Sequence, residues 1–140
     1  MASIYTAEAI ATGAGRNGHT RTTDGYVDLD LASPKEMGGS GNGANPEGLF
    51  AAGYAACFHS ALQLVARQEK VALGDSSVGA RVGIGPNDSG GFELEVTLEV
   101  VIPDLEHEKA NELAQKAHQV CPYSNATRGN IPVNVVVTDD

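Results

Sequence analysis

The sequence predicts an α+β fold in which two helices pack on mainly antiparallel sheets. Segments in which apolar and polar residues alternate occur near both ends and in the middle of the chain, and two stretches with helical periodicity separate them. No internal repeat or low-complexity linker interrupts this order. With 140 residues, against roughly 150 for a typical domain, the chain has room for one hydrophobic core. We therefore expect a single domain over residues 1–140.

The opening third of the chain is expected to form strands joined by turns. Residues 4–12 predict a strand that ends in a glycine-rich segment, residues 13–18, so that Arg16 lies in a turn. Residues 27–31 alternate apolar with acidic side chains, which is typical of a strand with one buried face. Residues 37–44 are rich in glycine but lack the Gly-Lys-Ser/Thr ending of a phosphate-binding loop, so a plain loop is predicted there.

The first long helix is expected to begin at residues 45–47, Asn-Pro-Glu, because Asn can cap a helix and Pro suits its first position. Apolar residues then recur at spacings of three and four from Phe50 to Val65, and this stripe includes Cys57. The periodicity therefore predicts a helix with one broad buried face.

A β-hairpin and a second helix are expected to follow. Residues 78–84 and 92–100 each alternate apolar and polar side chains, and a turn-forming stretch joins them. Pro103 starts the second helix, which continues until Pro122 forbids its extension. Residues 131–137 predict a last strand.

Composition and charge exclude several classes of function. The formal net charge is −9 and the basic residues are spread along the chain, whereas nucleic-acid binding draws on clustered Lys and Arg. The N-terminus lacks the basic and apolar parts of a signal peptide, and no segment is expected to supply the roughly 18 apolar residues of a membrane span. We expect a soluble, cytoplasmic protein with no nucleic-acid or membrane partner.

The two cysteines are the main candidates for chemistry. A permanent structural disulfide is not expected in a reducing compartment, so each thiol is an inert apolar residue, a metal ligand or a redox group. Cys57 lies in the apolar stripe of the first helix, and Cys121 ends the second helix at a turn. If the helices pack together, one thiol could form a sulfenic acid that the other converts to a disulfide. Their separation in sequence does not by itself predict this pairing.

A reactive thiolate at Cys57 needs a cation, because a free thiol titrates at roughly 8.5 and apolar burial raises that value. Cys57 is in mid-helix, away from the positive end of the helix dipole. Arg16 is the first candidate. His59 is the weaker one, since residues i and i+2 point to different sides of a helix. A solvated Arg16 without this role is the alternative.

Glu47 has two interpretations. An acidic residue in the first turn favours the positive helix end, and the same carboxylate could orient Arg16. Ten residues of helix, about 15 Å, separate Glu47 from Cys57, which one arginine can barely bridge. Either the helix is interrupted near Gly53, or a neighbouring subunit supplies Arg16 and Glu47 to Cys57 at a dimer interface.

A metal site is disfavoured. Cys57-x-His59 and His118-x-x-Cys121 together offer thiolate and imidazole ligands of the kinds that zinc uses. His118 and Cys121 share a helix face, but Cys57 and His59 do not. We therefore expect no metal at these residues.

Two segments around the cysteines form recognisable motifs. Residues 45–58 read Asn-Pro-Glu-Gly-Leu-Phe-Ala-Ala-Gly-Tyr-Ala-Ala-Cys-Phe, and residues 120–130 read Val-Cys-Pro-Tyr-Ser-Asn-Ala-Thr-Arg-Gly-Asn. These segments resemble the two cysteine motifs of the organic hydroperoxide resistance (Ohr) proteins, within the wider OsmC-like superfamily. The resemblance covers nearly the whole chain.

The resemblance implies a fold and a set of site residues. It implies an OsmC-like fold, an intertwined homodimer in which two long central helices are flanked by sheets and the active sites lie at the subunit interface. Cys57 would be the peroxidatic thiol and Cys121 the resolving thiol. Arg16 would stabilise the thiolate, and Glu47 would be the carboxylate partner of Arg16.

The resemblance also implies a substrate class and a reductant. Members of this family reduce organic hydroperoxides, including those of fatty acids, and are recycled by dihydrolipoyl dithiols on lipoylated proteins, with no flavin, haem or metal cofactor. Three aromatic side chains are expected to line the substrate pocket: Phe50, Tyr54 and Tyr123. Packing in the hydrophobic core explains the presence of these aromatic residues equally well. The alternative function is a redox-sensing or small-ligand binding module in which the thiol pair is oxidised without turnover.

Overall fold

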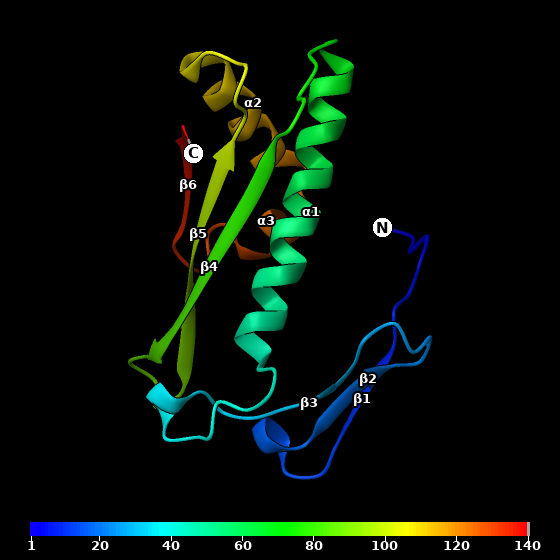
Figure 1. Cartoon of the computed structure of the whole chain (residues 1–140), viewed down its shortest axis with the longest axis vertical. Helices are drawn as coiled ribbons and strands as arrows, with labels where there is room; N and C mark the ends of the chain where they lie inside the picture. Colours follow the sequence, from blue (N-terminus) through cyan, green and yellow to red (C-terminus); the bar gives the residue numbers. More distant parts are fainter. Residues whose placement is uncertain (140) are drawn as a thin grey trace. The chain divides into compact units, whose positions relative to one another are not determined.

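A computed structural model describes residues 1–139 of the chain. They form two compact units, one from Met1 to Leu49 and one that begins at Phe50. Each unit has a three-stranded sheet of its own, so the predicted α+β class with mainly antiparallel pairing is confirmed (Figure 1). That both units belong to one domain stays a prediction.

The first unit is built on an antiparallel sheet with the strand order β1-β2-β3. The strand bounds are Ala9–Thr12 for β1, His19–Thr22 for β2 and Asp28–Asp30 for β3. The strand predicted over residues 4–12 was too long at its start, because pairing with β2 begins only at Ala9, opposite Thr22. The short strand β2 was not predicted, since His-Thr-Arg-Thr shows no alternation of apolar and polar residues.

Two 3₁₀ turns and a glycine-rich loop complete the first unit. Gly15–Asn17 lies between β1 and β2 and carries Arg16 in a turn, as predicted. Lys35–Met37 forms the second 3₁₀ turn. The loop that follows passes very close to neighbouring backbone, since a Cβ atom on Gly39 would lie 2.1 Å from the carbonyl oxygen of Ser33. This close approach requires glycine.

The sheet of the second unit has the order β4-β5-β6. β4 spans Ser77–Pro86 and β5 spans Phe92–Val101, and their antiparallel pairing confirms the predicted hairpin. In the hairpin turn, Asn87 Oδ1 accepts hydrogen bonds from the backbone N–H groups of Ser89 and Gly91. β6, Val133–Thr138, pairs with β5 in parallel, so this sheet is mixed.

The first helix, α1, covers Pro46–Gln68. It begins as predicted, because Asn45 Oδ1 accepts the N–H of Gly48 at 2.7 Å and so satisfies one of the free amides of the first turn. α1 continues through Gly53 without a break. The prediction that the helix is interrupted near Gly53, one of the two ways to bring Glu47 close to Cys57, is therefore wrong.

The other helices are α2, His107–Val120, and α3, Pro122–Thr127. α2 begins later than Pro103, because residues 103–105 form a turn in which the N–H of Leu105 bonds to the carbonyl of Ile102. Pro122 ends α2 as predicted, but it also occupies the first turn of α3, where its fixed φ and missing N–H are favourable. α3 was not predicted.

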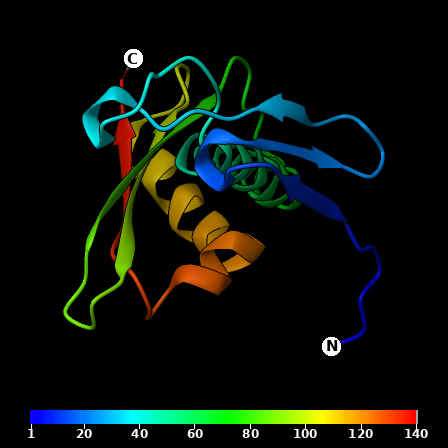
Figure 2. The same ribbon diagram turned by 90° about the horizontal axis from the view of Figure 1, so that it is seen from below.

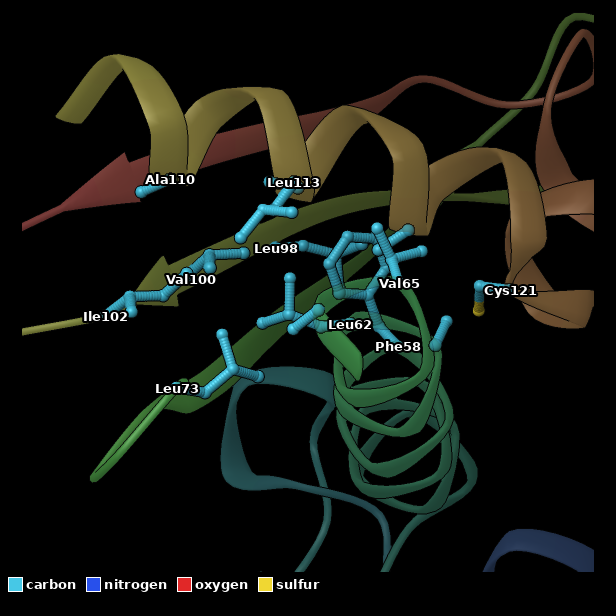
Figure 3. Packing of buried hydrophobic residues seen from close by; sticks show 14 of the residues in the cluster. Phe58, Leu62, Val65, Leu73, Leu98, Val100, Ile102, Ala110, Leu113 and Cys121 are labelled. Atoms are coloured by element: carbon cyan, nitrogen blue, oxygen red, sulfur yellow. The ribbon is translucent and has the colours of Figure 1, made fainter. Parts of the chain in front are cut away.

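One face of the β4-β5-β6 sheet packs against α1 and α2, and this contact forms the core of the second unit (Figures 2 and 3). Leu62 of α1, Leu98 of β5 and Leu113 of α2 are fully buried. Burial of each such side chain contributes about 1.5–3 kcal/mol relative to leaving it in water. Cys121 belongs to the same cluster and lies at its edge in Figure 3. The core therefore holds the end of α2 against α1.

α1 is long and apolar enough, by length and composition, to cross a membrane. The expectation that no segment supplies enough apolar residues for a membrane span was wrong for α1. A third of its most apolar stretch is buried inside the structure, and the core helix of a globular domain can have the same length and composition. Tyr54, Phe58 and Leu62 supply this buried face.

Candidate active site

The two thiols meet where α1 passes the junction of α2 and α3. Cys57 Sγ and Cys121 Sγ are 3.7 Å apart, and no disulfide joins them. Cys121 ends α2, with its N–H bonded to the carbonyl of Ala117, and also precedes the first residue of α3. Cys57 is partly exposed, whereas Cys121 is fully buried. The sequence predicted a contact between Cys57 and Cys121 only if the two helices pack together, and this contact is present.

The surroundings of Cys57 act on its pKa in opposite directions. Burial raises the pKa of the Cys57 thiol, which is the largest effect. The backbone N–H of Tyr123 donates to the Cys57 sulfur and works against this rise. The neighbouring Cys121 raises the pKa of Cys57 further, first through the hydrogen bond between the two thiols and then because two thiolates side by side repel each other. The net direction is upward, so this environment by itself favours the neutral thiol.

Arg16 and Glu47 form a bidentate ion pair in the first unit. Arg16 Nη1 and Nη2 donate to the two carboxylate oxygens of Glu47 at 2.7 and 2.6 Å. The hydrogen bond from Arg16 lowers the pKa of Glu47, and the same bond raises the pKa of Arg16. The predicted pairing of these two residues is therefore present. The Glu47 carboxylate fixes the guanidinium in one orientation, and a planar fork of this kind has further N–H groups for another acceptor.

Three aromatic rings pack beside the thiol pair. Phe50, Tyr54 and Tyr123 contact one another, with ring centroids 5.6–5.9 Å apart. The Tyr123 ring packs closely against α1 at Gly53, because a Cβ atom at this position would lie only 3.0 Å from Tyr123 Oη. The cluster thus joins α1 to α3 directly next to Cys57.

Part of this cluster lines a groove of about 870 Å³ in the second unit. Phe50 and Tyr123 lie in its wall, together with Phe92 and Leu94 of β5 and Ile131. Tyr54 does not line the groove, because it is fully buried and its hydroxyl is hydrogen-bonded inside the fold. Contact of these rings with a substrate stays a prediction.

The histidines considered as metal ligands have other partners. His59 Nε2 lies 3.0 Å from Ser76 Oγ, and His118 Nδ1 lies 2.7 Å from Ser124 Oγ. Within residues 1–139, no group of three or more His, Cys, Asp and Glu side chains is placed to hold a metal ion.

Sequence reasoning missed two contributors to this site. The backbone N–H of Tyr123 carries no residue signature, so no pattern in the sequence marks it as a donor to Cys57. Ser124 was also missed. The sequence did contain a signal for it, because Pro122 can begin a short helix, and Ser124 and Thr127, three residues apart, then lie on the same side of that helix.

Comparison with known proteins identifies the family. The family model described as OsmC-like protein matches residues 39–136. An organic hydroperoxide resistance protein of Xanthomonas axonopodis pv. citri is 50% identical over 136 residues, which cover 96% of this chain and 94% of that protein. The organic hydroperoxide resistance protein OhrB of Bacillus subtilis is 46% identical over 95% of this chain and 97% of its own length.

Solved structures agree with this result. An organic hydroperoxide resistance protein from Elizabethkingia anophelis has a TM-score of 0.94 and 52% identity, with all of both chains covered. The structure of Bacillus subtilis OhrB has a TM-score of 0.87 and 45% identity over 97% of this chain and all of that one. The chain therefore belongs to the OsmC-like family, on its branch of organic hydroperoxide resistance proteins.

Proposed function

We propose that this protein is a cysteine-based peroxidase that reduces organic hydroperoxides, fatty-acid hydroperoxides among them, to alcohols. The observation that carries the proposal is the contact of two free thiols at 3.7 Å, one partly exposed and one buried, in a chain of this family. The exposed thiol can meet a substrate, and the buried thiol is within reach of the product that forms on it. Protection against oxidative stress follows from this activity.

The first step is attack by the Cys57 thiolate on the terminal oxygen of the hydroperoxide. A sulfur–oxygen bond forms while the oxygen–oxygen bond breaks, and the departing alkoxide takes up a proton to become an alcohol. Cys57 is oxidised by two electrons to a sulfenic acid, and the hydroperoxide is reduced by the same two electrons. Cys57 is the peroxidatic residue in this scheme because it is the more exposed member of the pair.

The second step closes a disulfide. The Cys121 thiolate attacks the Cys57 sulfur, the sulfur–oxygen bond breaks, and the leaving hydroxide is protonated to water. A dithiol reductant, for which we propose the dihydrolipoyl group of a lipoylated protein, then reduces the disulfide by exchange and becomes a disulfide itself. The sequence of steps needs no metal, flavin or haem.

The thiolate at Cys57 requires a cation, and we propose Arg16 of the partner subunit in a homodimer. Support comes from α1, whose uninterrupted course leaves Glu47 ten residues, about 15 Å of helix, from Cys57. The Arg16–Glu47 pair supplies a fixed guanidinium with N–H groups to spare. A guanidinium beside the sulfur would offset the rise in pKa that burial imposes on Cys57.

The substrate chain and the cellular compartment complete the proposal. Phe50 and Tyr123 present aromatic surface in the groove, and the backbone of Tyr123 also contacts Cys57, which suits an apolar substituent on the hydroperoxide. The absence of clustered basic charge gives no support to a nucleic-acid partner. We place the protein in the cytoplasm, where lipoylated enzymes can serve as reductants.

Steady-state kinetics test this function. We expect consumption of cumene hydroperoxide with dihydrolipoamide as reductant, and much slower turnover with hydrogen peroxide or with glutathione. Peroxide loss is measured by residual hydroperoxide after quenching. A protein whose thiol pair is oxidised once but never turns over under these conditions would be a redox sensor, and the peroxidase proposal would then be rejected.

Replacement of Cys121 by serine is expected to trap the reaction after its first step. Without added dithiol, the variant should reduce about one equivalent of hydroperoxide per Cys57 and then accumulate Cys57 sulfenic acid, because no second thiol of the protein can displace the hydroxide. Dimedone labelling detected by mass spectrometry measures this species. Excess hydroperoxide should then convert it to sulfinic acid and inactivate the variant faster than the wild-type protein. Full retention of dithiol-dependent turnover would contradict the role of Cys121.

A further inference from the structure

A buried chain of hydroxyl groups lies behind the thiol pair. Tyr54 Oη of α1 is 2.8 Å from Ser124 Oγ and 3.1 Å from Thr127 Oγ1, both of α3. His118 Nδ1 of α2 is 2.7 Å from Ser124 Oγ. Tyr54 and Ser124 are fully buried. Ser124 is therefore bonded to two other helices and is the centre of this chain.

The direction of each hydrogen bond follows from the number of protons available. Thr127 donates its hydroxyl proton to the carbonyl of Ser124, so its oxygen accepts from Tyr54. Tyr54 then has no second proton, and Ser124 donates to it. This leaves Ser124 Oγ to accept from His118 Nδ1–H. All four contacts are satisfied in this order, whereas the reversed order leaves the Ser124 carbonyl without its bond from Thr127.

The state of His118 agrees with this order. Burial lowers the pKa of His118, and the positive charge of Arg128 lowers it further. A neutral imidazole carries one proton, and the bond to Ser124 places it on Nδ1. The groups that face His118 are Ser124, Arg128, which donates to the His118 carbonyl, and the ring of Phe58.

This chain is tied to both cysteines through the helices. Tyr54 lies three residues before Cys57 on α1, and His118 lies three residues before Cys121 on α2, so each is about one helical turn from a thiol. Ser124 joins these two turns and belongs to α3, the same short helix whose Tyr123 N–H reaches the Cys57 sulfur. Loss of the Ser124 hydroxyl would remove the side-chain bond from α3 to His118 of α2 and one of the two bonds from α3 to Tyr54 of α1.

We propose that Ser124 is a positioning residue for disulfide closure, holding Cys121 at bonding distance from Cys57 through its hydrogen bonds to Tyr54 and His118. This role adds a residue to the proposed peroxidase mechanism, and the expected effect on the rate of disulfide closure rests on that mechanism. The equilibrium between the two thiols and their disulfide does not depend on peroxidase activity. That equilibrium can therefore be tested separately.

The experiment compares Ser124→Ala and Tyr54→Phe with the wild-type protein. Each variant removes one hydroxyl from the chain, and Tyr54→Phe keeps the ring that packs on Phe50 and Tyr123. Ser76→Ala is the matched control, since it breaks another serine–histidine hydrogen bond, to His59, in the same unit but away from α3. The first readout is the equilibrium constant for disulfide formation against dithiothreitol.

We expect both variants to lower that equilibrium constant at least about tenfold, because a less well placed thiol has a lower effective concentration. A tenfold change corresponds to about 30 mV in the potential of the couple. The second readout is single-turnover kinetics of Ser124→Ala with cumene hydroperoxide. Oxidation of Cys57 should stay within about twofold of wild type, while disulfide closure slows at least about tenfold. Ser76→Ala should leave both readouts unchanged.

Two outcomes would overturn the positioning role. One is a disulfide equilibrium in both variants within twofold of wild type. The other is an equal slowing of both kinetic steps together with a lower melting temperature, which is the signature of a general structural defect. If Ser124→Ala does not fold, Tyr54→Phe still decides the equilibrium test. A wild-type protein that fails to turn over cumene hydroperoxide while the variants shift the disulfide equilibrium would remove the peroxidase proposal and keep the positioning role.

Discussion

Replacement of Cys57 by serine is expected to lower the rate of organic hydroperoxide reduction roughly a thousandfold or more. Serine is close to cysteine in size, so the packing of α1 should be unchanged. Its hydroxyl is a far weaker nucleophile than a thiolate and cannot form a sulfenic acid. The measurement is consumption of cumene hydroperoxide under conditions in which the wild-type protein turns over many times.

The Cys121→Ser variant is the control for this result, since it should retain a single turnover that Cys57→Ser lacks. Thermal melting of both variants checks that the core around α1 and α2 is intact. Undiminished turnover by Cys57→Ser would show that the nucleophile lies elsewhere and would remove the mechanism. A burst of one equivalent in Cys57→Ser would exchange the roles of the two thiols.

Replacement of Arg16 by alanine is expected to slow the reaction of Cys57 roughly a hundredfold at pH 7, because a cation that lowers a thiol pKa by about two units raises the thiolate fraction by that factor. Burial raises the pKa of Cys57, and the variant has nothing to offset it except the Tyr123 amide. The pH dependence should therefore move to higher pH, with the lost rate recovered as the thiol ionises. Alkylation of Cys57 by iodoacetamide across pH measures this shift directly.

Arg16→Lys separates charge from geometry. Lysine keeps the positive charge but cannot reproduce the bidentate contact of Arg16 with Glu47. We expect an intermediate rate and a smaller pH shift. An Arg16→Ala variant with the same pH profile as wild type would exclude Arg16 as the thiolate-stabilising cation.

Mixed dimers test whether the site is shared between subunits. A heterodimer of one Cys57→Ser subunit and one Arg16→Ala subunit contains an intact Cys57 and an intact Arg16 on different chains. If Arg16 acts across the interface, one complete site is restored and the heterodimer should show about half of the wild-type activity, since a dimer has two sites. Activity no higher than that of either parent would reject the shared site.

Sequence pattern located most of the fold because its periodic signals are strong. The β4-β5 hairpin and α1 follow alternation and helical spacing that extend over many residues. The elements that were missed have no such signal. β2 is a four-residue strand without apolar residues, and α3 is a short helix that begins at a proline. A proline in a sequence is compatible with two structures, because it can end one helix and can also occupy the first turn of the next.

The candidate site was predictable only in part for a related reason. Side-chain chemistry and motif resemblance marked Cys57, Cys121, Arg16 and Glu47 in the sequence. One donor to Cys57 within the second unit is a backbone amide, which every residue type except proline provides. The bonds of Ser124 join residues from three separate helices. Such contacts depend on tertiary packing, so no local pattern reports them.

The unequal exposure of Cys57 and Cys121 gives their disulfide a direction. A reductant that approaches from solvent can reach the sulfur of Cys57, while the sulfur of Cys121 is enclosed by the core. In the proposed cycle, attack would therefore occur at Cys57, the mixed disulfide with the reductant would form there, and Cys121 would be the departing thiolate. The Cys57 sulfur would then react with the hydroperoxide in one half of the cycle and with the reductant in the other, so the two substrates would use the same access route in turn.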